Sequence, residues 1–145
     1  MLLDRNDISR LIPHAGCMVL LESVLACDPL TLRAQAISHR DPGNPLRRGG
    51  ALSAVTGAEY AAQAAAVHGA LSAGGAPRPG FLAMIRDMHW TRDRFDELAV
   101  DLDIRVELVS AQSDSTLYDF TLDAGCEPLL RGRLAVFFPR QPTNP

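Results

Sequence analysis

Cysteine is scarce in this sequence, and the few copies form no redox or metal motif. Cys17, Cys27 and Cys126 are an odd number and show no C-x-x-C spacing. This pattern is typical of reduced thiols in a cytoplasmic protein and supplies no framework of zinc ligands. A nucleotide-binding motif is lacking too. We therefore expect a protein that works without a metal or a cofactor.

Long hydrophobic runs and basic stripes are also lacking. No apolar run approaches the roughly 20 residues that span a bilayer, and residues 1–7 carry acids where a signal peptide has a basic segment. The net charge is −3, with acidic and basic residues interleaved, so no basic surface for nucleic acid is indicated. We expect a soluble, cytoplasmic protein whose partners are neither nucleic acids nor membranes.

The apolar content suffices for one hydrophobic core. The chain has 145 residues, of which 47% are apolar and 21% are charged. A chain of this length and composition fits one domain that folds without disulfides or metal. We expect that domain to cover residues 1–138, followed by a polar tail at residues 139–145.

One segment has the pattern of a long helix, at residues 53–72. Most of its central side chains are alanine, which would let a sheet approach closely. Ser53 or Thr56 can cap it, and the spacing from Thr56 to Glu59 is that of a capping box. The glycines and prolines of residues 74–80 end it.

The segments before this helix are shorter. A first helix is expected at residues 8–11 with Asp7 as its N-cap. The alternation at residues 23–38 predicts a hairpin or a bent strand pair. Residues 39–50 are rich in proline, glycine and arginine and are expected to form an exposed loop.

The segments after the helix all have the period of strands. Alternation is strongest at residues 98–108, repeats at 117–122 and 129–138, and is preceded by a more buried candidate at 81–90. One long helix followed by antiparallel strands makes an α+β domain, with the helix packed against one face of the sheet.

Two short segments carry more specific information. Residues 11–24 read L-I-P-H-A-G-C-M-V-L-L-E-S-V, and residues 57–63 read G-A-E-Y-A-A-Q. The first resembles the L-P-H-x-x-P-x-L-L-x-D-x-V stretch of bacterial 3-hydroxyacyl-carrier-protein dehydratases, with Cys17 in place of the proline and Glu22 in place of the aspartate. The second resembles their E-x-x-x-Q helix. Together the two segments look most like the dehydratases of aryl polyene biosynthesis clusters.

This resemblance implies a hot-dog fold, in which a long central helix packs against an antiparallel sheet. It implies dehydration of a 3-hydroxyacyl thioester to the trans-2-enoyl thioester, with the acyl group on an acyl carrier protein or on coenzyme A. It also implies at least a homodimer, in which two sheets pair edge to edge and an acyl tunnel forms between subunits.

The reaction needs a base for the α-proton and an acid for the leaving hydroxyl, together with donors for the thioester oxygen. By the resemblance, His14 is the base and Glu59 the acid. The backbone N–H groups at the helix start would supply the donors, and Gly57 leaves room for the substrate there. Gln63 lies one turn after Glu59 and either orients it, beside the substrate, or satisfies a buried backbone group.

The chain departs from the housekeeping dehydratases at one position. Their G-H-F-P motif carries the catalytic histidine, and Pro45 stands at the corresponding place here. His39, on the neighbouring loop, is therefore the reserve partner for Glu59. Glu59 could otherwise be part of a capping box, and His14 could bond a backbone carbonyl in a turn.

Two other functions stay open at this point. A hot-dog thioesterase would use a carboxylate on the same helix to activate water, and a non-catalytic acyl-binding subunit would pair with an active homologue. Arg47 and Arg48 are either solvated loop residues or contacts for the carrier and its phosphopantetheine group. His68, His89 and the cysteines are expected to be structural.

Overall fold

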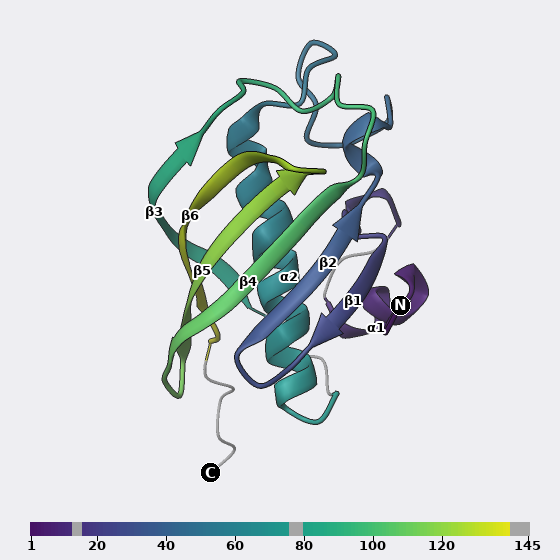
Figure 1. Ribbon diagram of the computed structural model, residues 1–145. Coiled ribbons are helices and arrows are strands. Elements are labelled where there is room, and N and C mark those ends of the chain that lie inside the picture. The colour runs from purple at the N-terminus through teal and green to yellow at the C-terminus, as the bar shows by residue number, and fades with distance from the viewer. Residues whose placement is uncertain (13–15, 76–79, 140–145) are drawn as a thin grey trace.

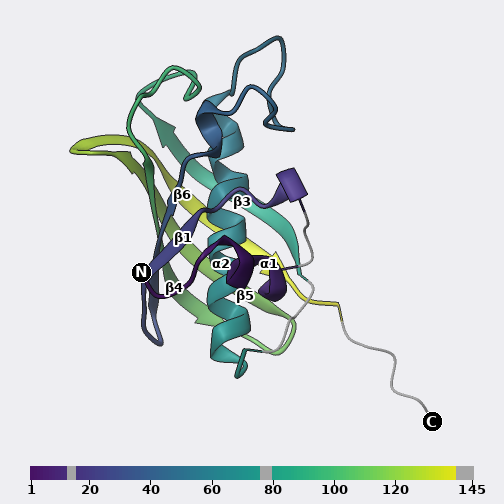
Figure 2. The same ribbon diagram turned by 90° about the vertical axis from the view of Figure 1, so that its right-hand side faces the viewer.

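The computed structural model describes residues 1–12, 16–75 and 80–139, and within them one long helix lies against one curved sheet (Figures 1 and 2). The elements run in the order α1 (Arg5–Leu11), β1 (Ser23–Cys27), β2 (Thr31–Ala36), α2 (Gly57–Ser72), β3 (Phe81–Trp90), β4 (Leu102–Ala111), β5 (Ser115–Ala124) and β6 (Glu127–Phe137). The sheet order is β1-β2-β4-β5-β6-β3, and every neighbouring pair is antiparallel. The predicted hot-dog arrangement is confirmed.

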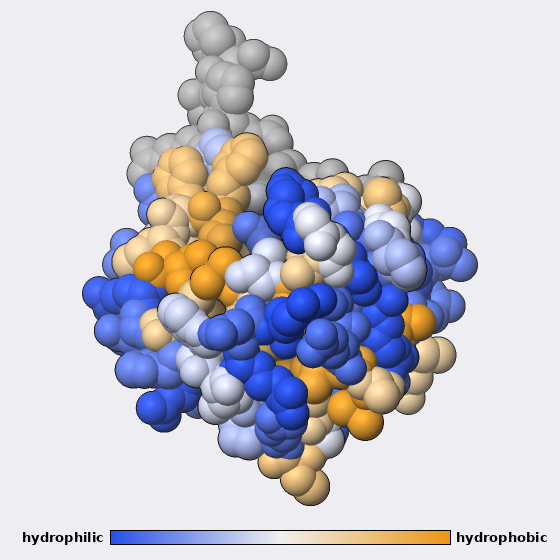
Figure 3. All heavy atoms as spheres, turned by 90° about the horizontal axis from the view of Figure 1, so that it is seen from above, coloured by the Kyte–Doolittle hydropathy of each residue, from blue (hydrophilic) through white to orange (hydrophobic). Residues whose placement is uncertain are grey.

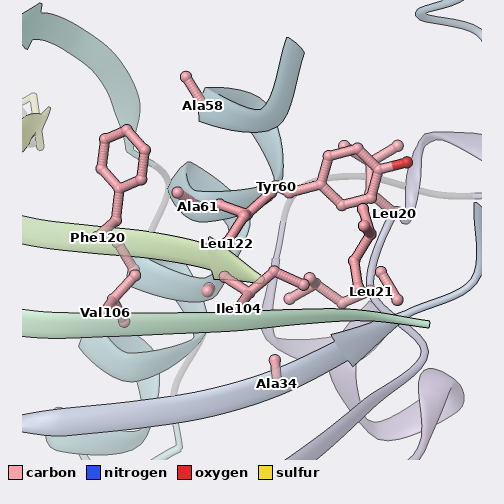
Figure 4. Close-up of a cluster of buried hydrophobic side chains, with 14 of the residues drawn as sticks. Leu20, Leu21, Ala34, Ala58, Tyr60, Ala61, Ile104, Val106, Phe120 and Leu122 are labelled. Carbon is pink, nitrogen blue, oxygen red and sulfur yellow. The ribbon is translucent and has the colours of Figure 1, made fainter. Parts of the chain in front are cut away.

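The small side chains of α2 bring it close to the sheet. Ala58, Ala61, Ala64 and Ala65 are buried on the helix, and Figure 4 shows Ala58 and Ala61 above the apolar side chains of the sheet. At Gly57 even a β-carbon would not fit, because it would lie 2.5 Å from Leu130 Cδ2. The sheet covers one side of α2, and α1 lies on the opposite side (Figure 2).

Alternation along the strands separates the core from the outer face of the sheet. On β4, Leu102, Ile104 and Val106 are fully buried while Arg105 is exposed. On the outer face, the Arg33 guanidinium binds the Asp103 carboxylate with N–O distances of 2.6 to 3.2 Å. Exposed ion pairs of this kind add little stability, so most of the stability of the fold comes from burial of the apolar inner face.

Both helix starts differ from the sequence prediction. Asp4, and not Asp7, is the N-cap of α1: the Asp4 carboxylate accepts the Asp7 N–H at 2.9 Å, and the Asp7 carboxylate accepts the Asp4 N–H at 3.0 Å. The long helix begins at Gly57, with Thr56, one of its two predicted caps, at the N-cap position, because Ala54–Thr56 forms a 3₁₀ turn. Thr56 makes no side-chain cap and donates its hydroxyl to the Ser53 carbonyl.

Two predictions about the strands were also wrong. The strand β3 is not the more buried one; it is an edge strand, with Phe81 62% and Trp90 46% exposed. The strand β4 begins at Leu102 and not at Leu98. Leu98 and Val100 lie in the preceding loop, where Leu98 is buried and Val100 is exposed. None of the helices in residues 1–12, 16–75 and 80–139 is long and apolar enough to cross a bilayer.

Candidate active site

Glu59 lies in the first turn of α2, on the side of the helix that the sheet leaves uncovered. Its side chain is exposed and lines a cleft of about 210 Å³ between α2 and the β3 edge. The other described residues of this cleft are Ala62, Gln63, Ala66, Gly80, Phe81, Leu82 and Val136. The cleft thus has one carboxylate at the start of the helix and mostly apolar walls.

The Glu59 carboxylate is not used to cap the helix. In a capping box it would accept the Thr56 N–H, but that N–H donates to the Ser53 carbonyl at 3.0 Å. Among the residues that the structure describes, Glu59 has no hydrogen bond and no ion pair. The capping interpretation is therefore excluded, and this carboxylate is available for chemistry in the cleft.

Gln63 joins the two sequence motifs. Its Oε1 accepts the Leu20 N–H at 2.9 Å, and its Nε2 donates to the Met18 carbonyl at 2.6 Å. Gln63 is buried, so both ends of its amide are occupied by the backbone that follows the L-P-H segment. Of the two interpretations of Gln63, the structure supports the one in which it satisfies buried backbone groups. Its contact with substrate stays a prediction.

His14 falls in residues 13–15, outside the described residues, so its distance to Glu59 is left open. The described backbone of the same motif resumes at Gly16 and reaches α2 at Met18 and Leu20, one helical turn from Glu59. The structure thus brings the two motifs to the same part of the helix.

A buried polar network fixes the same backbone from the other side. Ser38 Oγ donates to the Leu20 carbonyl at 2.7 Å and lies 2.8 Å from the Tyr60 hydroxyl, which also accepts from Asn44 Nδ2 at 3.0 Å. Burial raises the pKa of Tyr60, so its hydroxyl stays protonated and donates to Ser38. No sequence pattern predicts this network: Asn44 lies in the segment predicted to be an exposed loop, but it is buried.

The start of α2 offers fewer free amides than expected. The Gly57 N–H donates to the Ala54 and Val55 carbonyls, because the 3₁₀ turn extends the helix backwards. The Gly57 α-carbon faces Leu130, Leu122 and Phe95 in the core. Gly57 therefore has a packing role, and its contact with substrate stays a prediction.

His39, the reserve candidate, is fully buried and is not among the described residues that line the cleft. Its Nε2–H donates to the Val100 carbonyl at 2.9 Å and to the Leu98 carbonyl at 3.2 Å. Its Nδ1 has no hydrogen-bond partner among the described residues. Burial, with the nearby Arg40 guanidinium, lowers the pKa of His39, although Asp101 and the two carbonyls oppose this. His39 thus ties the loop before α2 to the loop before β4.

This burial predicts a loss of stability on mild acidification. The pKa of His39 is lower in the folded chain than its ordinary value of 6.5, so the unfolded state binds more protons as the pH falls below that value. We expect the free energy of unfolding to be highest above pH 6.5 and to decline toward the lower folded-state pKa. Urea titrations across this range should show a flatter decline for His39→Gln; equal slopes would contradict the prediction.

The remaining histidines lie apart from the cleft. His68 is fully buried: its Nε2–H donates to the Asp28 carbonyl at 2.9 Å, and its Nδ1 accepts from the Tyr118 hydroxyl at 2.8 Å. Burial raises the pKa of Tyr118 to about 12, so this hydroxyl stays a donor. His89 is exposed on β3. In the described part of the chain, no group of three or more His, Cys, Asp and Glu residues lies close enough to hold a metal ion.

Arg47 and Arg48 lie on the loop before α2 and bind its own backbone. The Arg47 guanidinium donates to the Gly50 carbonyl at 3.0 Å and to the His39 carbonyl at 3.1 Å. Arg48 donates to the carbonyls of Pro45 and Arg47 at 3.0 and 2.8 Å. These contacts show how the loop is held, and a role in carrier binding stays a prediction.

Solved structures with the same fold include dehydratases and thioesterases. A chain of the dehydratase heterocomplex ApeI:P from Xenorhabdus doucetiae is 24% identical, with a TM-score of 0.81 over 92% of this chain and 91% of that chain. Zebrafish thioesterase superfamily member 2 is 14% identical, with a TM-score of 0.64 over 93% and 92%. AziG of S. sahachiroi is 13% identical, with a TM-score of 0.64 over 91% and 100%. At these identities the likeness establishes the hot-dog fold.

Among curated protein sequences, no significant match is found. A family model gives the decisive comparison, since the model for the ApeP dehydratases matches residues 6–144. This match spans both motifs, the whole of α2 and the four strands that follow it. The dehydratase resemblance of the two motifs is thereby confirmed, and the chain belongs to the ApeP-like family of dehydratases.

Proposed function

We propose that the chain removes water from a 3-hydroxyacyl thioester bound in the cleft between α2 and β3, with Glu59 as the acid and His14 as the base. The observation that carries this proposal is the position of Glu59. It is a carboxylate without a described partner, at the polar end of a cleft whose other walls are mostly apolar. A thioester with an apolar tail fits such a cleft.

His14 takes a proton from the α-carbon, the electron pair forms the double bond to the β-carbon, and the bond from the β-carbon to the hydroxyl breaks. The Glu59 carboxyl gives its proton to the departing hydroxyl, which leaves as water. The imidazolium then returns one proton to the carboxylate, so the pair is ready for the next substrate.

Gln63 and Tyr60 support this chemistry indirectly. They hold the backbone of Met18 and Leu20 against α2, directly and through Ser38, one helical turn from Glu59. In this proposal they are positioning residues, because none of these bonds reaches the reacting atoms.

The test offers the purified chain a 3-hydroxyacyl thioester on an acyl carrier protein and, separately, on coenzyme A. Mass spectrometry follows loss of water, and a thiol reagent follows free thiol. Loss of water without thiol supports the proposal, and the better carrier identifies the physiological one. Free thiol without loss of water would make the chain a thioesterase, and neither product would favour the non-catalytic acyl-binding subunit.

We further propose that the chain works as at least a dimer formed through the β3 edge, with a second copy as its partner. Within the described residues, the outer edge of β3 has no neighbouring strand, and Phe81, Ile85 and Trp90 on β3 are 62, 41 and 46% exposed. Seen from above, hydrophobic residues form one patch on the left, the side on which β3 lies in Figure 1, and another at the lower right (Figure 3). A long, apolar and unpaired edge strand is a template for pairing with another chain. A second sheet there would also cover the cleft beside Glu59.

A charge on this edge is expected to dissociate the assembly. Ile85→Lys places an ammonium group in the proposed interface, and we expect the mass measured by light scattering to fall to that of the monomer. Val109→Lys is the matched control, because Val109 on β4 is 45% exposed, close to the 41% of Ile85. An unchanged mass in the Ile85 variant would place the interface elsewhere. If the wild-type chain is monomeric alone and dimerises only with a related subunit, the second-copy proposal is wrong.

A further inference from the structure

The cleft beside Glu59 follows α2 from Glu59 to Ala66. Residues three or four apart share one face of a helix, so Ala62 and Ala66 follow Glu59 along the cleft and Gly69 lies one turn further. Gly80, Leu82 and Val136 form the opposite wall. The polar group of the site is therefore at one end, and the walls beyond it are small or apolar.

The Phe138 ring lies beyond Ala66, next to Gly69 and Gly80. A β-carbon added at Gly80 would lie 2.7 Å from Phe138 Cε1, and one added at Gly69 would lie 3.7 Å from Phe138 Cζ. The ring thus packs between the last turns of α2 and the start of β3. Phe138 is only 3% exposed, and its N–H donates to the Asp114 carbonyl at 2.7 Å, so the ring is held in place.

We propose that Ala66 and Phe138 set the length of acyl chain that the enzyme accepts. This inference rests on the proposed function, since it takes the thioester to lie beside Glu59. The ten residues from Glu59 to Gly69 span about 15 Å of helix at a rise of about 1.5 Å each, and an extended chain advances about 1.2 Å per bond. The channel therefore takes acyl chains of up to about 12 carbons.

Ala66→Leu shortens the channel. Ala66 is seven residues from Glu59, about 10 Å along the helix, so a leucine there stops the chain after about 8 carbons. Each methylene that no longer enters costs about fourfold in affinity, so chains of about 12 carbons should bind at least tenfold more weakly. Chains of about 4 to 6 carbons end before position 66 and should bind within about twofold of wild type.

Phe138→Leu lengthens the channel. The smaller side chain opens the space between Gly69 and Gly80, and each methylene that enters it adds about fourfold in affinity. The two variants shift the length limit in opposite directions, which a general loss of stability would not do. Ala73→Leu is the control, because Ala73 is exposed just after the end of α2.

The experiment measures binding and turnover separately, on the full-length chain in the assembly in which it purifies. Calorimetry with saturated acyl-pantetheine thioesters of about 4 to 16 carbons gives the length profile without any reaction. Dehydration of the matching 3-hydroxyacyl thioesters gives the activity. Circular dichroism confirms that each variant is folded.

A profile that moves toward shorter chains in Ala66→Leu and toward longer chains in Phe138→Leu, and stays unchanged in Ala73→Leu, supports the inference. The same profile in wild type and in folded variants overturns it, and so does the absence of binding by any chain length. If the profiles shift as expected but no thioester loses water, the acyl-binding channel is supported and the proposed reaction is wrong.

Discussion

Glu59→Gln is expected to lower kcat/KM for dehydration at least about 100-fold, the usual contribution of a positioned acid. Glutamine has the size of glutamate but has no acidic proton to give to the leaving hydroxyl. Glu59 is exposed and has no bond to any described residue, so the thermal midpoint should stay close to that of wild type. The measurement is single-turnover dehydration of a 3-hydroxyacyl thioester, beside a thermal melt of the same sample.

Glu107→Gln is the matched control. Glu107 is exposed on the outer face of β4, away from the cleft, and its replacement should leave turnover unchanged. A loss of activity in both variants would point to an effect of charge in general. Full activity in Glu59→Gln would exclude Glu59 as the acid.

His14→Ala is the companion experiment for the base. A loss as large as that of Glu59→Gln, and a double variant little worse than either single one, would show that the two groups act as a unit. Retention of full turnover would exclude His14. His39 would then be a poor substitute, because it is fully buried and its Nε2–H is committed to two carbonyls.

Gln63→Ala is expected to lower both stability and turnover. The change leaves the buried Leu20 N–H without its acceptor, which costs about 1–3 kcal/mol of unfolding free energy. It also removes the donor to the Met18 carbonyl, so the backbone after the L-P-H segment loses its anchor to α2. Urea denaturation measures the first effect, and kcat for dehydration measures the second.

The controls for Gln63 separate positioning from folding. Gln112→Ala removes the same amide from an exposed site and should change neither quantity. Gln63→Glu keeps the acceptor for Leu20 but loses the donor to Met18, so a loss of kcat in a variant that stays folded would support positioning. If Gln63→Ala is destabilised while kcat at a temperature where it is folded is unchanged, Gln63 has a structural role only.

The local hydrophobic pattern of the sequence was sufficient to predict most of the helices and strands. The alternation at residues 23–38 became the hairpin of β1 and β2, and that at residues 117–122 and 129–138 became β5 and β6. The alanine-rich segment became α2. These segments each present one apolar face, and a single buried face fixes both the element and its orientation. The joint occurrence of the two motifs was sufficient for the family.

The sequence by itself thus determined the elements, the hot-dog arrangement and the family, because those depend on periodicity and short motifs. Tertiary structure alone decided that β3 is an exposed edge, since its apolar residues look the same whether a neighbouring strand is present or not. It decided that Gln63 binds the backbone of Met18 and Leu20, that Ser38, Asn44 and Tyr60 form a buried network beside them, and that His39 is buried, because such contacts join residues far apart in the chain. No local sequence pattern indicates which distant carbonyl or amide a polar side chain will bind.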